Sequence, residues 1–229
     1  MKYWRSVLRR VVSVVKKLSS RGLPFRGDEE EFGSLRNGNF MMCMELITEF
    51  DPFLAGHIAQ YGNRGKGNTS CLSFSTYEEI IIIMGKTVSE EIVKEIVESK
   101  YFSIIVDSTP DVSHCDQLSF IIQYVNRDGL HRESFLEFIK NTGHTGEELA
   151  DSVLKFLDSH GLDIKNCRGQ TYNNAANLSG IYFGLQARIK ALNPLAFFIP
   201  CSTHSLNLLG SSVVMCCKLA RTFFDLQNI

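Results

Sequence analysis

The stretch Tyr101-Phe-Ser-Ile-Ile-Val-Asp107-Ser-Thr-Pro-Asp111 constrains the fold of this chain more than any other. Residues 102–106 form a short apolar run rich in β-branched side chains, which is typical of a buried strand. Asp107 follows directly, so its carboxylate is expected at the end of that strand. A carboxylate in this position commonly belongs to a metal-dependent phosphoryl-transfer site. The sequence therefore predicts a sheet whose edge carries Asp107.

The second half of the chain alternates strands and helices. Asn126-Arg-Asp-Gly129 has the turn chemistry of a hairpin between two of the strands, and Thr145 with Glu148 forms a capping box that starts a helix. The order is strand, hairpin pair, helix, strand, helix, strand, helix, which is typical of an α/β ribonuclease-H-like fold. Such a fold has a mixed sheet of hairpin strands plus parallel strands, flanked by helices. The predicted strands are 102–106, 118–125, 130–138, 163–171 and 196–199, and the predicted helices are 145–160, 179–192 and a long one from about 202 to the C-terminus.

Residues 1–99 are expected to form a helical N-terminal region, followed by the ribonuclease-H-like core at 100–229. The first helix is amphipathic, and its apolar face is predicted to carry Trp4, Leu8, Val11, Val15 and Leu18. A membrane surface could bind that face, but packing on a core is the favoured role. Further helices are predicted at 40–50, 52–60, 76–84 and 88–99, after a loop at 26–40.

Charge is unevenly distributed although the net charge is only -1. Eight basic residues and no acid precede Asp28, and Asp225 is the only acid from Ile164 onward. Two basic ends around an acidic middle are compatible with a polyanionic partner such as DNA, while solvated surfaces explain the same pattern. The residues predicted to contact phosphates are Arg9, Arg10, Lys16 and Lys17.

Several classes of protein are excluded or disfavoured. The seven cysteines are odd in number and irregularly spaced, which favours reduced thiols in an intracellular compartment. The longest interior apolar run, Ile80–Met84, is too short to cross a bilayer, so membrane insertion is excluded. The glycine-rich stretch Gly62–Asn68 lacks the Lys-Ser/Thr ending of a phosphate loop.

Eight short motifs carry a family resemblance. They occur in the family's order over nearly the whole chain: Gly22-Leu-Pro-Phe-Arg-Gly27, Asn37-Gly-Asn-Phe40, Phe50-Asp-Pro52, Tyr101–Asp111, Asp116-Gln-Leu118, Cys167-Arg-Gly-Gln-Thr-Tyr172, Ala176-Asn-Leu-Ser-Gly180 and Cys201-Ser-Thr-His204-Ser-Leu-Asn-Leu208. The chain resembles hAT-superfamily transposase-derived proteins related to MYM-type zinc-finger proteins. The resemblance implies a ribonuclease-H-like core preceded by helices, a nuclear location, and active relatives that cut and join DNA with three metal-binding acids.

Carried over by residue, the resemblance makes Asp107 the first catalytic acid and a metal ligand. The second acid belongs directly after Tyr172, where this chain has Asn173. The third is a glutamate beyond a helical insertion, so the core is expected to be truncated before it. Cys201-x-x-His204 matches a motif that the family associates with the active site. The zinc-finger DNA-binding module expected before the core and the dimerisation segment expected after it are also missing from this sequence.

Chemistry alone gives the same expectation. Two-metal catalysis needs several carboxylates to offset four positive charges, and asparagine supplies no charge. Asp163 precedes the fourth strand, and Asp225 lies about 30 Å along the final helix from His204 at about 1.5 Å per residue. We therefore expect weak metal binding, no required cofactor and no DNA cleavage. The alternative is an active, Mg²⁺- or Mn²⁺-dependent transposase or nuclease, completed by a missing C-terminal part or a partner chain.

The single motifs also have plainer interpretations. Asp107 could cap its own loop through Ser108-Thr109. Cys201 and His204 have half the ligand count of a zinc site, could form a thiol dyad, or could cap and pack the last helix, which is the default. Asn173, Asn174 and Asn177 could bind nucleotides or turn the chain into the next helix. A third hypothesis is a protein-interaction scaffold or homodimer, using an apolar final helix that ends at Phe223-Phe224-Asp-Leu226.

Overall fold

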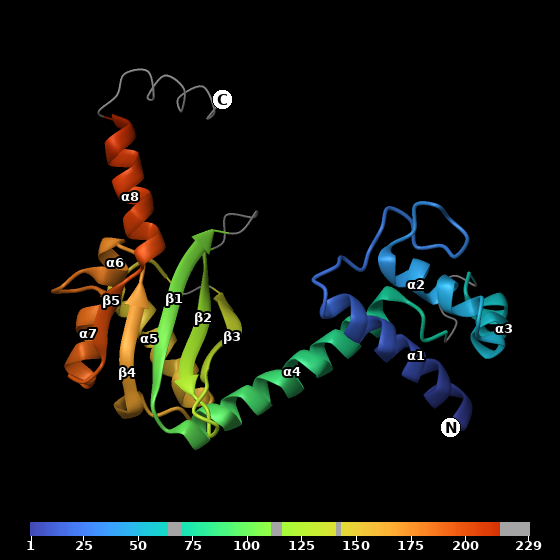
Figure 1. The fold of residues 1–229 in the computed structure, drawn as a ribbon, viewed down its shortest axis with the longest axis horizontal. Helices are drawn as coiled ribbons and strands as arrows, with labels where there is room; N and C mark the ends of the chain where they lie inside the picture. The colour runs from blue at the N-terminus through green and yellow to red at the C-terminus, as the bar shows by residue number, and fades with distance from the viewer. Residues whose placement is uncertain (64–69, 111–115, 141–142, 216–229) are drawn as a thin grey trace. The chain divides into compact units, whose positions relative to one another are not determined.

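The computed structural model describes residues 1–63, 70–110, 116–140 and 143–215 (Figure 1). The chain divides into two compact units, Met1–Val88 and Ser89–Ile229, and each is described by itself. The division falls within the helix α4 (Phe74–Ser99), whereas the boundary predicted from the sequence falls at the end of that helix. No helix in the described ranges is long and apolar enough to span a bilayer.

The first unit is helical. It contains α1 (Lys2–Ser19), α2 (Asn39–Thr48), α3 (Pro52–Tyr61) and the first part of α4. The predicted packing of α1 on a core is confirmed, because α1 buries Val7, Val11, Val14, Val15 and Leu18 in a cluster with residues of the other three helices. Leu8 was wrongly assigned to this face and is 36% exposed. At about 100° per residue the buried stripe runs instead through Val7 and Val14.

Two predicted helices, 76–84 and 88–99, are one continuous helix, α4. Gly85 weakens a helix by only about 1 kcal/mol relative to alanine, and no proline interrupts the segment. Ser89 and the acids after it are therefore inside a helix rather than at its start. By contrast, α3 begins where expected: the Asp51 carboxylate accepts hydrogen bonds from the backbone N–H groups of Phe53 (3.1 Å) and Leu54 (3.2 Å).

The motif segments 22–27 and 37–40 meet directly in the first unit. Gly27 and Gly38 stack backbone on backbone, since a Cβ on either glycine would lie 2.4 Å from the other's nitrogen. The Phe40 N–H donates to the Phe25 carbonyl (3.2 Å), and the Asn39 amide donates to the Pro24 carbonyl (2.8 Å). The two glycines are thus required by a close crossing of two chain segments.

The second unit is built on a five-stranded mixed sheet in the order β3-β2-β1-β4-β5 (Figure 1). The pairs β1–β2 and β2–β3 are antiparallel, and β1–β4 and β4–β5 are parallel. This confirms the ribonuclease-H-like α/β fold predicted from the element order. The strands are β1 (Phe102–Pro110), β2 (Asp116–Val125), β3 (His131–Lys140), β4 (Cys167–Tyr172) and β5 (Phe197–Pro200).

The helices of this unit lie between the strands or follow the last one. They are α5 (Gly146–Ser159), a 3₁₀ turn η1 (Ile164–Asn166), α6 (Ala176–Ser179), α7 (Leu185–Leu192) and α8 (Ser202–Met215). The predicted helix at 179–192 is wrong in its first part, because the chain leaves the helical path between α6 and α7. There Gly180 and Gly184 approach so closely that a Cβ on Gly184 would lie 2.5 Å from the Gly180 nitrogen.

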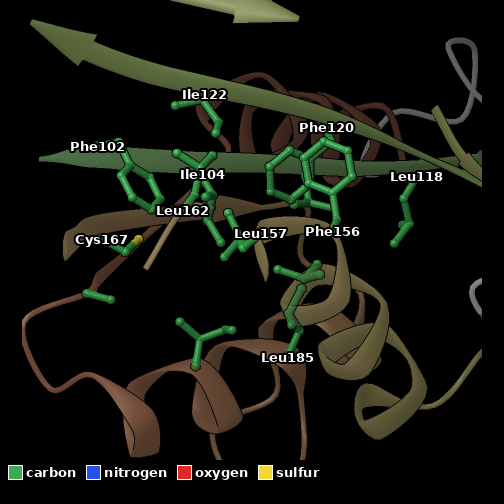
Figure 2. Packing of buried hydrophobic residues seen from close by; sticks show 14 of the residues in the cluster. Phe102, Ile104, Leu118, Phe120, Ile122, Phe156, Leu157, Leu162, Cys167 and Leu185 are labelled. Atoms are coloured by element: carbon green, nitrogen blue, oxygen red, sulfur yellow. The ribbon is translucent and has the colours of Figure 1, made fainter. Parts of the chain in front are cut away.

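One face of the sheet forms the core of the second unit. Alternate residues of β1 and β2, among them Ile104 and Phe120, are fully buried against α5 and α7 (Figure 2). The Phe120 and Phe156 rings lie 4.3 Å apart, which joins β2 to α5. Because side chains alternate across a strand, Asp107 points to the opposite face from Ile104 and Val106. The core therefore fixes β1 and leaves the Asp107 carboxylate exposed.

Candidate metal and nucleic-acid sites

The carboxyl ends of β1, β4 and β5 lie at one edge of the sheet, because these strands are parallel. This edge collects the residues that the sequence singled out. Asp107 lies in β1, Asn173 follows β4 directly, and Cys201 follows β5 directly. The Cys201 N–H donates to the Tyr172 carbonyl at 3.0 Å, which fixes the end of β5 beside the end of β4. We refer to this group of residues as the strand-end site.

Asp107 and Asn173 contact each other through their side chains. The Asn173 amide nitrogen donates to Asp107 Oδ1 at 3.3 Å. The orientation of the amide is set by a second bond, since Asn173 Oδ1 accepts the backbone N–H of Ala175 at 2.9 Å. A flipped amide would put an NH₂ group against that N–H and lose this bond. Asn173 therefore uses its oxygen in the loop and presents hydrogens to Asp107.

This arrangement does not fit a two-metal centre. The position to which the resemblance assigns a second acid holds a neutral amide, and its hydrogens point at the Asp107 carboxylate. A divalent ion next to Asp107 would face N–H groups rather than an anionic oxygen. Among the described residues, no cluster of three or more His, Cys, Asp or Glu side chains is arranged to hold a metal ion.

Cys201 and His204 lie where the last strand passes into α8. Cys201 is the residue before the helix, and its carbonyl accepts the N–H (3.0 Å) and the hydroxyl (2.9 Å) of Ser205. His204 is half-buried in the first turn. Asn174 donates to the Ser205 hydroxyl at 3.3 Å, so the loop after β4 is tied to the start of α8. The sequence did not predict this last link.

Other candidate residues lie elsewhere. Asp163 caps η1 by accepting the Lys165 N–H at 2.9 Å, before β4 starts, and so at the opposite edge of the sheet from Asp107. Asn177 donates to the His144 carbonyl at 3.0 Å. Of the residues singled out in the sequence, Asp111, Phe223, Phe224, Asp225 and Leu226 lie outside the described ranges.

Two buried polar groups on β4 were missed by the sequence analysis. Neither Tyr172 Oη nor Gln170 Oε1 has a hydrogen-bond partner in the described part of the chain, and both side chains are 1% exposed. Burial raises the pKa of Tyr172 well above its usual value, so the phenol stays protonated at neutral pH. Their only sequence signal is the alternation of Gly169 and Thr171 with Gln170 and Tyr172, which puts the polar pair on the core face.

The four basic residues predicted to contact phosphates all lie on α1 in the first unit. Arg9, Lys16 and Lys17 are exposed. Arg10 has partners within the unit: its Nε lies 2.5 Å from Asp51 Oδ2, and its guanidinium carbon lies 4.6 Å from the centre of the Phe53 ring. The Arg10 bond is the largest cause of a lowered pKa at Asp51.

The fold is that of a ribonuclease-H-like domain, and at its strand ends a carboxylate of β1 is paired with an amide that follows β4. The family described as "ZMYM1/FAM200, RNase-like domain" (DUF4371) matches residues 1–184, and the chain belongs to it. This confirms the resemblance to domesticated, hAT-type transposase-derived proteins.

Two curated relatives carry the same name, "52 kDa repressor of the inhibitor of the protein kinase". The chain is 25% identical to the Homo sapiens protein over 141 residues, which is 62% of this chain and 18% of that protein. It is 25% identical to the Mus musculus protein over 140 residues, or 61% of this chain and again 18% of the relative. The matched region is thus less than a fifth of either relative.

Proposed function

We propose that this transposase-derived domain is catalytically inactive and serves to bind DNA or a protein partner in the nucleus. The observation that carries the proposal is the Asn173 amide, whose hydrogens point at Asp107 while its oxygen is held by the Ala175 N–H. One carboxylate cannot neutralise two divalent ions. That the two relatives are named as repressors supports a regulatory role over catalysis.

The first test changes Asn173→Asp. One aspartate oxygen keeps the Ala175 N–H, and the other comes about 3.3 Å from Asp107 Oδ1 in place of the amide nitrogen. Two carboxylates so close repel each other unless a proton or a cation lies between them. We expect the variant to bind Mn²⁺ or Mg²⁺ at least about tenfold more tightly than the unchanged chain, measured by calorimetry and by the rise in melting temperature.

The matched control is Asn174→Asp, which adds the same charge one residue further along. Asn174 contacts Ser205 rather than Asp107, so this variant should not gain metal affinity. Strand cleavage is measured in parallel with Mg²⁺ or Mn²⁺ on supercoiled DNA. Cleavage by the unchanged chain that disappears in Asp107→Ala would overturn the inactive assignment.

One observation favours a second candidate, an enzyme completed from outside these 229 residues. Asp107 remains exposed at the strand end, and the chain spans only 18% of its relatives' length. A further carboxylate from another segment or chain would then complete the site. Adding the downstream part of a longer relative in trans and measuring Mn²⁺-dependent nicking separates the two: activity that needs Asp107 supports the enzyme.

In this proposal, the helix α1 provides the DNA-binding surface. Arg9, Lys16 and Lys17 are exposed cations, and Arg10 is neutralised in part by Asp51. Each lost phosphate contact lowers the slope of log affinity against log salt by about 0.9. The triple variant Arg9→Ala, Lys16→Ala, Lys17→Ala should therefore flatten that slope by up to about 2.7. Binding that does not depend on salt would exclude this role for α1.

The control for this experiment removes the same charges elsewhere. Arg132, Lys155 and Lys190 are exposed residues of the second unit. Their triple alanine variant should leave the salt slope as it is in the unchanged chain. An equal loss in both triple variants would mean that net charge, and not α1, governs the interaction with DNA.

A further inference from the structure

A pocket of about 620 Å³ lies in the first unit, between the loop after α1 and the segment that leads into α4. Its floor is aromatic. The Tyr77 ring lies 4.6 Å from Phe40 and is stacked on Phe25 at 5.4 Å. Phe32 and Phe74 add two further rings to the lining. Because Tyr77 and Phe40 are buried, Phe32 and Phe74 are the rings that an entering group would meet.

One side of this pocket is acidic. Glu29, Glu30 and Glu31 are consecutive, exposed and part of the lining. Glu29 is engaged, since its carboxylate accepts the Ser34 hydroxyl (2.5 Å) and lies 3.9 Å from Arg36. Within the described ranges, no ion pair or side-chain hydrogen bond involves the carboxylate of Glu30 or Glu31. Two negative charges are therefore available to a ligand.

Glu30 lines the same pocket as Tyr77. Burial raises the pKa of Tyr77, and the charge of Glu30 adds to that increase. The phenol of Tyr77 is therefore neutral at neutral pH, and the negative charge of the pocket comes from the glutamates. Aromatic faces beside uncompensated carboxylates attract a cation with an apolar stem.

The wall of the same pocket already holds one cation in this way. The Arg26 guanidinium carbon lies 4.8 Å from the centre of the Phe74 ring, and Arg26 is ion-paired with Glu78. Glu78 neutralises Arg26, so this arginine does not offset the charge of Glu30 and Glu31. Arg26 shows that this wall can hold a guanidinium group between an aromatic ring and a carboxylate.

We propose that this pocket binds a lysine or arginine side chain from a basic segment of a protein partner. The ammonium or guanidinium group would lie beside Glu30 and Glu31, and the methylene stem would lie over the ring of Phe32. An anionic ligand would meet two uncompensated carboxylates, and an apolar one would leave them without a partner. The site is independent of the strand-end site, and it does not depend on the proposed function.

The experiment uses the whole chain and a fluorescein-labelled peptide of alternating lysine and alanine. Affinity is measured by fluorescence anisotropy, next to a matched peptide with norleucine in place of each lysine. Norleucine keeps the stem and removes the charge, so its binding should be at least about fivefold weaker. Equal binding of the two peptides would overturn the proposal, as would no measurable binding of the lysine peptide.

Two pairs of variants locate the binding. Glu30→Gln with Glu31→Gln should weaken the lysine peptide about fivefold, through loss of two exposed charge contacts. Its control is Glu49→Gln with Glu79→Gln, two exposed residues outside the pocket lining, which changes the net charge equally. Phe32→Leu should weaken binding about threefold by removing a ring face, whereas Phe50→Leu, an 82% exposed ring outside the lining, should not.

The comparison of these variants decides the outcome. All of them change exposed or half-buried side chains, and melting curves of each confirm that the chain is folded. A loss in Glu30→Gln with Glu31→Gln that exceeds the loss in the control pair supports the pocket. Equal losses in the two pairs would show that the peptide responds only to net charge, and would reject it.

Discussion

The strand-end site and the pocket of the first unit both place acidic side chains beside polar or aromatic partners, but they differ in how those acids are satisfied. At the strand ends Asp107 accepts a hydrogen bond from Asn173, whose own oxygen is held by Ala175. In the pocket, Glu30 and Glu31 border rings and have no ion-pair partner in the described part of the chain. The first arrangement is complete within the chain, and the second is open to a cation.

In the proposed function, this difference separates a strand-end site without catalysis from a pocket that binds a partner. Under the same proposal, an amide at position 173 in place of an acid lets the chain satisfy the Asp107 carboxylate, so no metal is needed to offset repulsion there. The scaffold around it need not change, because the sheet core lies on the opposite face from Asp107. The pocket depends instead on a separate feature, the close crossing of two glycines in the first unit.

The largest expected effect comes from breaking that crossing with Gly38→Ala. A Cβ at position 38 would lie 2.3 Å from the Phe25 carbonyl oxygen and 2.4 Å from the Gly27 nitrogen. Backbone atoms cannot move aside cheaply, so we expect a loss of roughly 2–3 kcal/mol in unfolding free energy. Affinity for the lysine peptide should fall with it, because Phe25 and Gly27 line the pocket. Urea unfolding, with hydrogen exchange at residues 39–61, gives the unfolding free energy, and fluorescence anisotropy gives the affinity for the lysine peptide.

Gly56→Ala is the control for this variant. Gly56 lies inside α3, and a Cβ there meets nothing within 4 Å. Alanine should stabilise that helix by up to about 1 kcal/mol. If Gly38→Ala were as stable as the unchanged chain, the two motif segments would not cross as described.

A smaller effect on stability should distinguish the strand-end site from the pocket of the first unit. Asn173→Ala removes the acceptor of the Ala175 N–H and the donor to Asp107, which should cost about 1 kcal/mol. Glu30→Ala removes a carboxylate with no described partner, so stability should change by less than about 0.5 kcal/mol. The midpoints of urea unfolding of the two variants give the comparison. A larger cost for Glu30→Ala would mean that the pocket acid is satisfied within the chain.

The sequence predicted the sheet well because its signals were local. Apolar runs predicted β1 and β2, and Asn126 with Gly129 predicted the turn between β2 and β3. Thr145 with Glu148 predicted the start of α5. Helix ends were harder. Gly85 lies in the gap between two predicted helices, but it is tolerated inside the continuous helix α4. The break between α6 and α7 comes instead from the close approach of Gly180 and Gly184, which no local pattern predicts.

The candidate sites were only partly accessible from sequence. The position of Asp107 followed from an apolar run that ends in an acid, and the position of Asn173 followed from the family motif. The direction of the Asn173 amide depends on the Ala175 N–H, and the use of Arg10 depends on Asp51, 41 residues away in the chain. The pocket brings together rings from segments up to 52 residues apart, such as Phe25 and Tyr77, so no local sequence pattern predicts it.

The smallest effect concerns Glu148, a second acid whose hydrogen-bond donors come from within the chain. Its Oε2 accepts the N–H of Thr145 (3.0 Å), the Thr145 hydroxyl (2.9 Å) and the N–H of His144 (3.1 Å). These bonds, the Thr145 N–H first, lower the pKa of Glu148 below its ordinary value of 4.5. Stability from this group is therefore full above pH 4.5 and is lost as pH falls through the lower folded pKa.

Two variants isolate this contribution in unfolding free energies measured between pH 2 and pH 6, a range of about two units around the pKa of a free carboxyl. Glu148→Gln should flatten the loss of stability at low pH, because no proton then binds at this position. Thr145→Ala removes the hydroxyl and keeps the backbone N–H, which is the largest cause of the shift. It should therefore lower stability at every pH and keep most of the slope. A slope that vanishes in Thr145→Ala would show that the hydroxyl, and not the backbone, holds the carboxylate.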